Sequence, residues 1–153
     1  TRNSSMKRSI ATVSLSGTLP EKLEAIAAAG FDGVEIFEND LLYYAGSPRE
    51  VRQICADLGL AITLFQPFRD FEGCRRDRLQ RNVERAERKF ELMAALGVPL
   101  MPCCSNTSPP ARDDPARAAA QQPALAAPAS AHGLPAGVQL LARRRATRGL
   151  PTA

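Results

Sequence analysis

Several polar side chains in this 153-residue chain follow short apolar segments that have strand character. They are Glu38, Gln66, Arg69, Ser105 and Asn106. The carboxyl ends of parallel strands meet at one edge of a sheet or barrel, which is where such folds place their chemistry. We therefore expect these side chains to form one site for a small polar ligand.

Arg69, within the sequence FQPFRD of residues 65–70, is the most informative of them. A planar guanidinium can bind a carboxylate or a phosphate through two parallel hydrogen bonds. The alternative is a surface arginine that pairs with Asp70 or Glu72. Arg69 favours an acidic ligand over a neutral sugar.

The remaining candidates have weaker support from the sequence. Glu38 could hold a substrate hydroxyl or a metal ion, or it could pair, like Glu35, with a nearby arginine. Tyr43 and Tyr44 lie in an expected loop and could line a pocket mouth. Cys104 has no base near it in the sequence, and His132 precedes a glycine, as helix-capping residues do. We assign no catalytic residue.

The elements that must position these residues repeat one order: an amphipathic helix, a glycine and a short apolar strand. The expected strands are 9–15, 33–38, 61–68 and 98–105, the helices end at Gly30, Gly59 and Gly97, and the clearest helix is 77–96. That helix has a charged face that includes Arg85, Glu87, Arg88 and Glu91, expected to be a solvated outer surface. Thr18 with Glu21, and Ser47 with Glu50, predict capping boxes. The order predicts an α/β fold, the N-terminal half of a (β/α)8 TIM barrel with about four βα units.

Composition limits the function classes. The net charge of +4 without a basic run that contains aromatics argues against nucleic-acid binding, and no apolar stretch suits a membrane span. The four cysteines form no CxxC pair, which favours reduced thiols in a cytoplasmic protein. Residues 1–5 are expected to be a leader extension ahead of Met6.

Residues 107–153 differ from the partial barrel domain expected at 6–106. They contain no aromatic residue, Glu or Lys, and they are rich in Ala, Pro and Arg. A low-complexity tail, disordered or not, and a shifted reading frame both explain this composition. A helix could begin near 113–117, with Pro123 and Pro128 unfavourable in its interior, and 137–142 is a candidate fifth strand.

Three segments resemble the bacterial 3-dehydroshikimate dehydratases: residues 6–19 (MKRSIATVSLSGTL), 33–40 (GVEIFEND) and 64–73 (LFQPFRDFEG). That family lies in the xylose-isomerase-like TIM-barrel, or sugar phosphate isomerase/epimerase, superfamily. Some of its members are fused to a 4-hydroxyphenylpyruvate dioxygenase-like domain. The resemblance covers about residues 6–106.

The resemblance implies a lyase that removes water from 3-dehydroshikimate to give protocatechuate in quinate and shikimate catabolism. It also implies a divalent metal (Mg, Mn or Co), and Arg69 matches the family arginine expected to bind the substrate carboxylate. Glu38, Gln66 and Ser105 are expected to bind substrate because of their places at the strand ends. Gln139 stands where the family has its first metal-binding glutamate. We therefore expect a truncated dehydratase that is inactive as this chain.

Two other hypotheses remain open. A sugar phosphate isomerase or epimerase of the same superfamily would use the same strand ends. A non-catalytic half-barrel would associate with itself through its open edges. A DNA-repair nuclease of the superfamily fits less well, because that chemistry uses several histidines and His132 is the only one.

Overall fold

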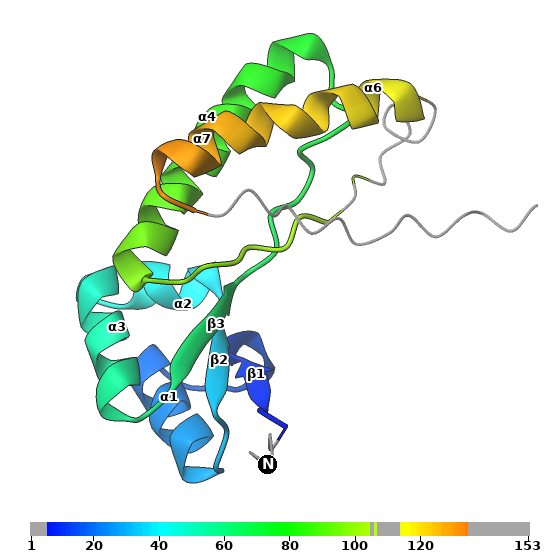
Figure 1. Cartoon of the computed structure of the whole chain (residues 1–153). Coiled ribbons are helices and arrows are strands. Elements are labelled where there is room, and N and C mark those ends of the chain that lie inside the picture. Colours follow the sequence, from blue (N-terminus) through cyan, green and yellow to red (C-terminus); the bar gives the residue numbers. More distant parts are fainter. Residues whose placement is uncertain (1–5, 105, 107–113, 135–153) are drawn as a thin grey trace, which may run out of the picture.

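The computed structural model describes residues 6–104, 106 and 114–134 (Figure 1). Three parallel strands form one sheet in the order β1 (Ser9–Ala11), β2 (Gly33–Ile36) and β3 (Ala61–Phe65). Ser9 pairs with Gly33, and Gly33 pairs with Ala61. This parallel sheet with its helices is the α/β partial barrel that the sequence predicts.

Helices α1 (Leu19–Ala28) and α3 (Pro48–Asp57) pack on this sheet. Both begin at the predicted capping boxes, and each has a proline in its first turn. Gly30 and Gly59 follow them with φ of +75° and +71°, a left-handed conformation that favours glycine. The core between helices and sheet consists of fully buried aliphatic and aromatic side chains, among them Leu23, Ile26, Val34, Ile36, Val51 and Phe65.

The first strand is shorter than predicted, because residues 12–14 form the 3-10 helix η1 (Thr12–Ser14). The buried Thr12 hydroxyl accepts a hydrogen bond from the Phe37 amide at 3.0 Å. This side chain therefore satisfies the backbone N–H of the residue that follows β2. Two further predictions are corrected here. β2 ends before Glu38, and the segment expected to be a loop with the two tyrosines begins with the short helix α2 (Glu38–Tyr43).

The prediction of a fourth strand at 98–105 is wrong, because the described residues of this segment form no regular strand. Residues 98–104 lie alongside β3 and its extension, but only one isolated parallel bridge forms there, between Phe68 and Cys103. The segment accepts hydrogen bonds at two carbonyls, from Phe65 N to Leu100 O (2.9 Å) and from Phe68 N to Pro102 O (2.7 Å). Pro99 and Pro102 have no N–H to donate, and this explains why a regular ladder does not form. The third strand likewise ends at Phe65, close before Pro67.

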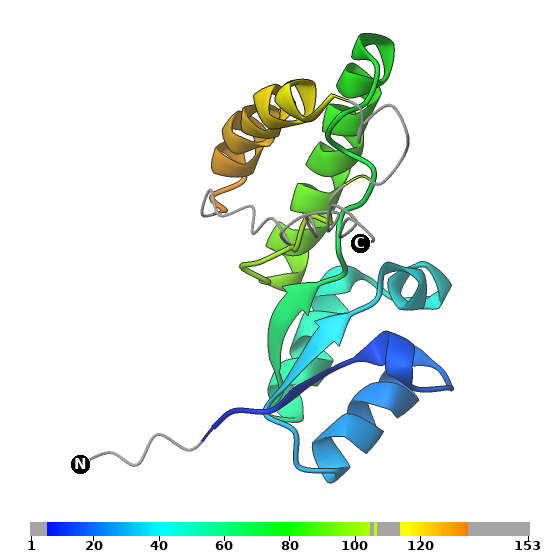
Figure 2. The same ribbon diagram turned by 90° about the vertical axis from the view of Figure 1, so that its right-hand side faces the viewer.

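The long helix predicted at 77–96 is confirmed as α4 (Arg76–Leu96), which ends at Gly97 with φ of +70°. It extends beyond the carboxyl ends of the strands (Figures 1 and 2). Its apolar face, with Ala86, Phe90 and Met93 buried, joins the core. The N-terminal part of α4 therefore stands above the sheet edge where the site is expected.

The Ala-rich segment contains α6 (Pro115–Gln121), η2 (Gln122–Leu125) and α7 (Ala126–Ala131). Together they run along α4 (Figure 2), with Leu125 and Ala129 buried. Pro123 lies in the 3-10 turn rather than inside an α-helix, and His132 caps α7 as predicted. The candidate strand at 137–142 lies outside the described residues. None of the helices in the described ranges is both long enough and apolar enough to cross a membrane.

Candidate functional site

A pocket of about 450 Å³ lies at the carboxyl ends of β2 and β3, against α4. We call it the strand-end pocket. It is lined by Val13, Glu35, Phe37, Glu38, Asn39, Gln66, Pro67, Arg69, Arg85 and Lys89. Three of the predicted site residues, Glu38, Gln66 and Arg69, thus meet at one place.

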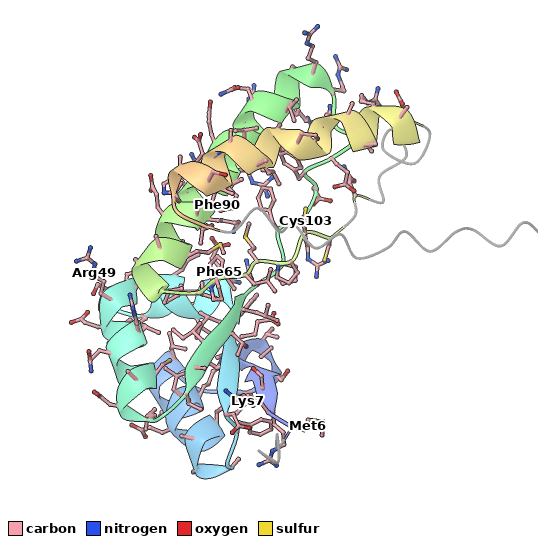
Figure 3. The ribbon with its side chains drawn as sticks, in the orientation of Figure 1. Met6, Lys7, Arg49, Phe65, Phe90 and Cys103 are labelled. Carbon is pink, nitrogen blue, oxygen red and sulfur yellow. The ribbon has the colours of Figure 1, made fainter. Side chains whose placement is uncertain are left out.

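Glu38 is held by two donors. One of its oxygens, Oε2, accepts from Gln66 Nε2 at 2.8 Å and from Lys89 Nζ at 2.5 Å. Lys89 is only 8% exposed, and its ammonium lies 5.7 Å from the centroid of the Phe65 ring. Figure 3 shows Phe65 where β3 approaches α4. The alternative partner expected for Glu38 is an arginine, whereas the cation that pairs with it is Lys89.

Arg69 is exposed, and within the described residues its guanidinium makes no ion pair or hydrogen bond. The alternative pairing with Asp70 or Glu72 does not form. Glu72 is instead buried, and its Oε1 accepts from the Asn106 amide at 2.6 Å. The Arg69 guanidinium therefore remains available to a ligand in the strand-end pocket.

Arg85 corrects one expectation from the sequence. It was placed on the solvated face of the long helix, but it is half-buried and lines the pocket. Its guanidinium lies 5.0 Å from the centroid of the Phe68 ring and donates to Asn82 Oδ1 at 3.0 Å. The polar face of α4 meets the loop after β3, because α4 projects above the sheet. Asn82, Arg85 and Lys89 are three and four residues apart and therefore lie on one row of the helix surface, but this spacing alone does not show whether the row faces solvent or another loop.

Glu35 faces the same pocket from β2. Burial raises the pKa of its carboxyl group, because desolvation disfavours the charged form. The pairing of β2 with β3 shifts register between Val34 and Glu35. Such irregularities often redirect a side chain beside a site.

The other predicted residues do not join the pocket. Asn106 is buried at a separate cavity, where its side chain donates to the Glu72 carbonyl at 2.9 Å. Tyr43 and Tyr44 line a third pocket, between α1 and α2. Ser105 and Gln139 lie outside the described residues.

The two adjacent cysteines differ in exposure. Cys103 is buried, and burial and then the nearby Glu72 and Cys104 raise the pKa of its thiol to about 12. Cys104 is half-buried. A thiol with so high a pKa is a poor nucleophile at neutral pH, so the structure provides no reason to assign Cys103 a catalytic role.

The part of the chain that the structure describes contains no group of three or more His, Cys, Asp or Glu side chains that could hold a metal ion. Of the two carboxylates in the strand-end pocket, Glu38 is already bound to Lys89 and Gln66. The described residues therefore do not fit the divalent metal that the resemblance implies.

Comparison with known proteins gives strong matches. The chain is 81% identical over 109 residues to the 3-dehydroshikimate dehydratase of Pseudomonas putida. The matched region covers 71% of this chain and 17% of that protein. It is 69% identical over 137 residues to the 3-dehydroshikimate dehydratase of Pseudomonas aeruginosa. Here the matched region covers 90% of this chain and 22% of that protein. The chain thus spans about a fifth of the length of these relatives.

The fold comparison agrees. A solved xylose isomerase-like TIM barrel/4-hydroxyphenylpyruvate dioxygenase fusion protein superposes with a TM-score of 0.80 at 70% identity, over 86% of this chain and 21% of that chain. The sequence also matches the family described as Xylose isomerase-like TIM barrel over residues 23–149. With its parallel βα units and its pocket at the strand ends, this chain belongs to the xylose isomerase-like TIM barrel family.

Proposed function

We propose that the strand-end pocket binds the carboxylate of 3-dehydroshikimate through Arg69, as part of an enzyme that removes water from this compound to give protocatechuate. The observation that carries the proposal is the Arg69 guanidinium at the carboxyl edge of the sheet, which has no partner among the described residues. A charge-assisted, two-point hydrogen bond to a carboxylate is the interaction that this group makes best. The high identity to two proteins with this name supports the choice of ligand.

The neighbouring residues have distinct roles in this proposal. Glu38, oriented by Gln66 and Lys89, accepts a hydrogen bond from a ligand hydroxyl through its second oxygen. Gln66 offers its amide oxygen to another hydroxyl. Ser105 remains a proposed ligand contact that lies outside the described residues. The pocket thus combines one site for an anion with several for hydroxyl groups.

The chemistry of water removal does not reside in these residues. The divalent metal that the family resemblance implies would stabilise negative charge on the substrate, but the described residues do not hold it. Gln139 replaces the glutamate of that site, and an amide ligates a hard cation more weakly than a carboxylate does. We propose that this chain binds the ligand without turning it over.

Binding is tested by calorimetric titration of 3-dehydroshikimate into the 153-residue chain and its Arg69→Met variant. Loss of a charge-assisted contact of this kind is expected to weaken binding about 10- to 100-fold. Arg49→Met is the matched control, because Arg49 is exposed on α3 and is not among the residues that line the pocket (Figure 3). Equal affinities of the parent chain and Arg69→Met would refute the proposal.

Turnover is tested separately, by the absorbance of protocatechuate in the presence of Mg²⁺ or Mn²⁺. We expect no product above the rate without protein. Robust turnover by the parent chain would refute the claim that it lacks activity, and it would leave the role of Arg69 untouched.

A further inference from the structure

We propose that Arg85 is a second carboxylate-binding residue of the strand-end pocket, so that the ligand carboxylate is bound by two guanidiniums, one of them held in place by the fold. The inference rests on the proposed function for the identity of the ligand. Nothing in the charged face of the helix sequence set Arg85 apart; its position in the structure does.

The fold holds the Arg85 guanidinium in place before any ligand binds. Its Nη1 donates to Asn82 Oδ1 at 3.0 Å, and its plane lies near the Phe68 ring, 5.0 Å from the centroid. Asn82 is itself only 8% exposed, and its Nδ2 donates to the Asp70 carbonyl at 3.0 Å. These contacts fix the direction in which Asn82 presents its oxygen. A preorganised cation loses little side-chain entropy when it binds an anion.

Several N–H donors of the Arg85 guanidinium remain unused by the described residues. A guanidinium has five N–H donors, and Arg85 uses one on Asn82 and another, at 3.5 Å, on the Arg69 carbonyl. Both acceptors are neutral, and the part of the chain described shows no carboxylate paired with Arg85. Arg85 lines both the strand-end pocket and the neighbouring cavity beside Asn82, and its positive charge and its other donors are available to a ligand there.

The charges around the pocket favour binding of a carboxylate near the two arginines. The Arg85 guanidinium donates to the main-chain carbonyl of Arg69, so the two arginines are neighbours in the pocket lining. Lys89, one turn further along α4, is neutralised by Glu38, and Glu35 repels an anion when it is ionised. The field in the pocket therefore directs a carboxylate toward the two arginines. A carboxylate has two oxygens with about four acceptor positions, enough for two guanidiniums.

The test compares two probes, 3-dehydroshikimate and its methyl ester, in calorimetric titrations of the parent chain and the Arg85→Met variant. The ester carries no negative charge and so cannot form an ion pair with a guanidinium, which means that a direct role lowers affinity for the acid much more than for the ester. We expect Arg85→Met to weaken binding of the acid about tenfold and binding of the ester less than about twofold. Arg81→Met is the matched control, because Arg81 is exposed on the same helix and lines no described pocket.

Three results would overturn the inference or its basis, and they can be told apart. If Arg85→Met binds the acid like the parent while Arg69→Met does not, the inference is wrong and the proposed function stands. If Arg85→Met weakens acid and ester equally, Arg85 only supports the loop. If the parent chain binds neither probe, the proposed function itself fails. Should Arg85→Met fail to fold, Arg85→Lys keeps the charge and must show an intermediate acid-to-ester ratio.

Discussion

Two groups of residues in the strand-end pocket use positive charge differently. In the first, which we call the strand side, Lys89 of α4 is buried and bound to Glu38 after β2, and Gln66 completes the contact. On the arginine side, formed by Arg69 and Arg85, no carboxylate neutralises either guanidinium within the described residues. A cation that is paired with a carboxylate inside the fold thus contributes to stability, whereas a cation without a carboxylate partner at a pocket contributes to ligand binding.

The largest expected effect is on the strand side. Lys89→Met leaves the Glu38 carboxylate, whose side chain is 23% exposed, without its cation. Removing one partner of a largely buried pair is expected to lower the free energy of unfolding by about 3 kcal/mol. Urea denaturation followed by circular dichroism measures it. Lys7→Met is the control, since Lys7 is exposed near the N-terminal end (Figure 3); an equal loss in both variants would contradict the matched-charge argument.

A second variant sharpens the same point. Glu38→Gln combined with Lys89→Met removes both charges and keeps a group that can bond Gln66. Because the orphaned carboxylate is gone, we expect the double variant to regain about 2 kcal/mol of the stability lost in Lys89→Met. The measurement is a double-mutant cycle that also includes Glu38→Gln alone. Additive losses would show that the pair does not couple.

The arginine side is expected to depend on backbone conformation. Asp70, next to Arg69, has φ of +57°, the left-handed region in which a Cβ is unfavourable. Asp70→Ala should therefore be less stable than Asp70→Gly by about 1 kcal/mol, although both lose the same carboxylate. Thermal unfolding of the two variants side by side tests this. A more stable alanine variant would mean that the loop relaxes to another conformation.

The smallest effect concerns pH. Burial raises the pKa of Glu35 above its ordinary 4.5, so the folded state binds this proton more tightly than the unfolded state does. The ionised group thus disfavours folding at neutral pH, and this penalty disappears as the pH falls through the raised pKa and below 4.5. Glu35→Gln should be more stable than the parent at pH 7, by less than about 1 kcal/mol because the group is partly exposed to solvent.

The control for Glu35→Gln is the same comparison at pH 4, measured by urea denaturation. There the difference should shrink, because both forms are then largely uncharged at this position. A difference that grows toward low pH would mean that Glu35 is stabilised as an anion in the fold.

Much of the fold follows from local signals in the sequence. The capping boxes at Thr18 and Ser47 and the glycines after each helix fix where helices begin and end, since these positions depend on neighbouring residues alone. The meeting of Glu38, Gln66 and Arg69 was also predictable. Parallel strands place their carboxyl ends at one edge, whatever the side chains between them are.

The remaining half of the pocket was not predictable from local signals. Arg85 and Lys89 lie on a charged helix face. The periodicity of the sequence does not show whether such a face contacts solvent or another loop of the protein. This face meets the loop after β3 because α4 projects past the sheet edge, and that position depends on tertiary packing. The fourth strand failed for a different reason: its apolar residues have strand character, but its prolines cannot donate to a ladder.

The order of the strands has a consequence for how the chain acquires this structure. Each strand pairs with the one immediately before it in the sequence, β2 with β1 and β3 with β2. Within the described three-stranded sheet no strand pairing has to wait for a segment made much later, so each of these βα units can dock on the preceding one as it leaves the ribosome. The sheet can grow in the direction of synthesis, and Arg69 follows β3, the last strand of that sheet to be made.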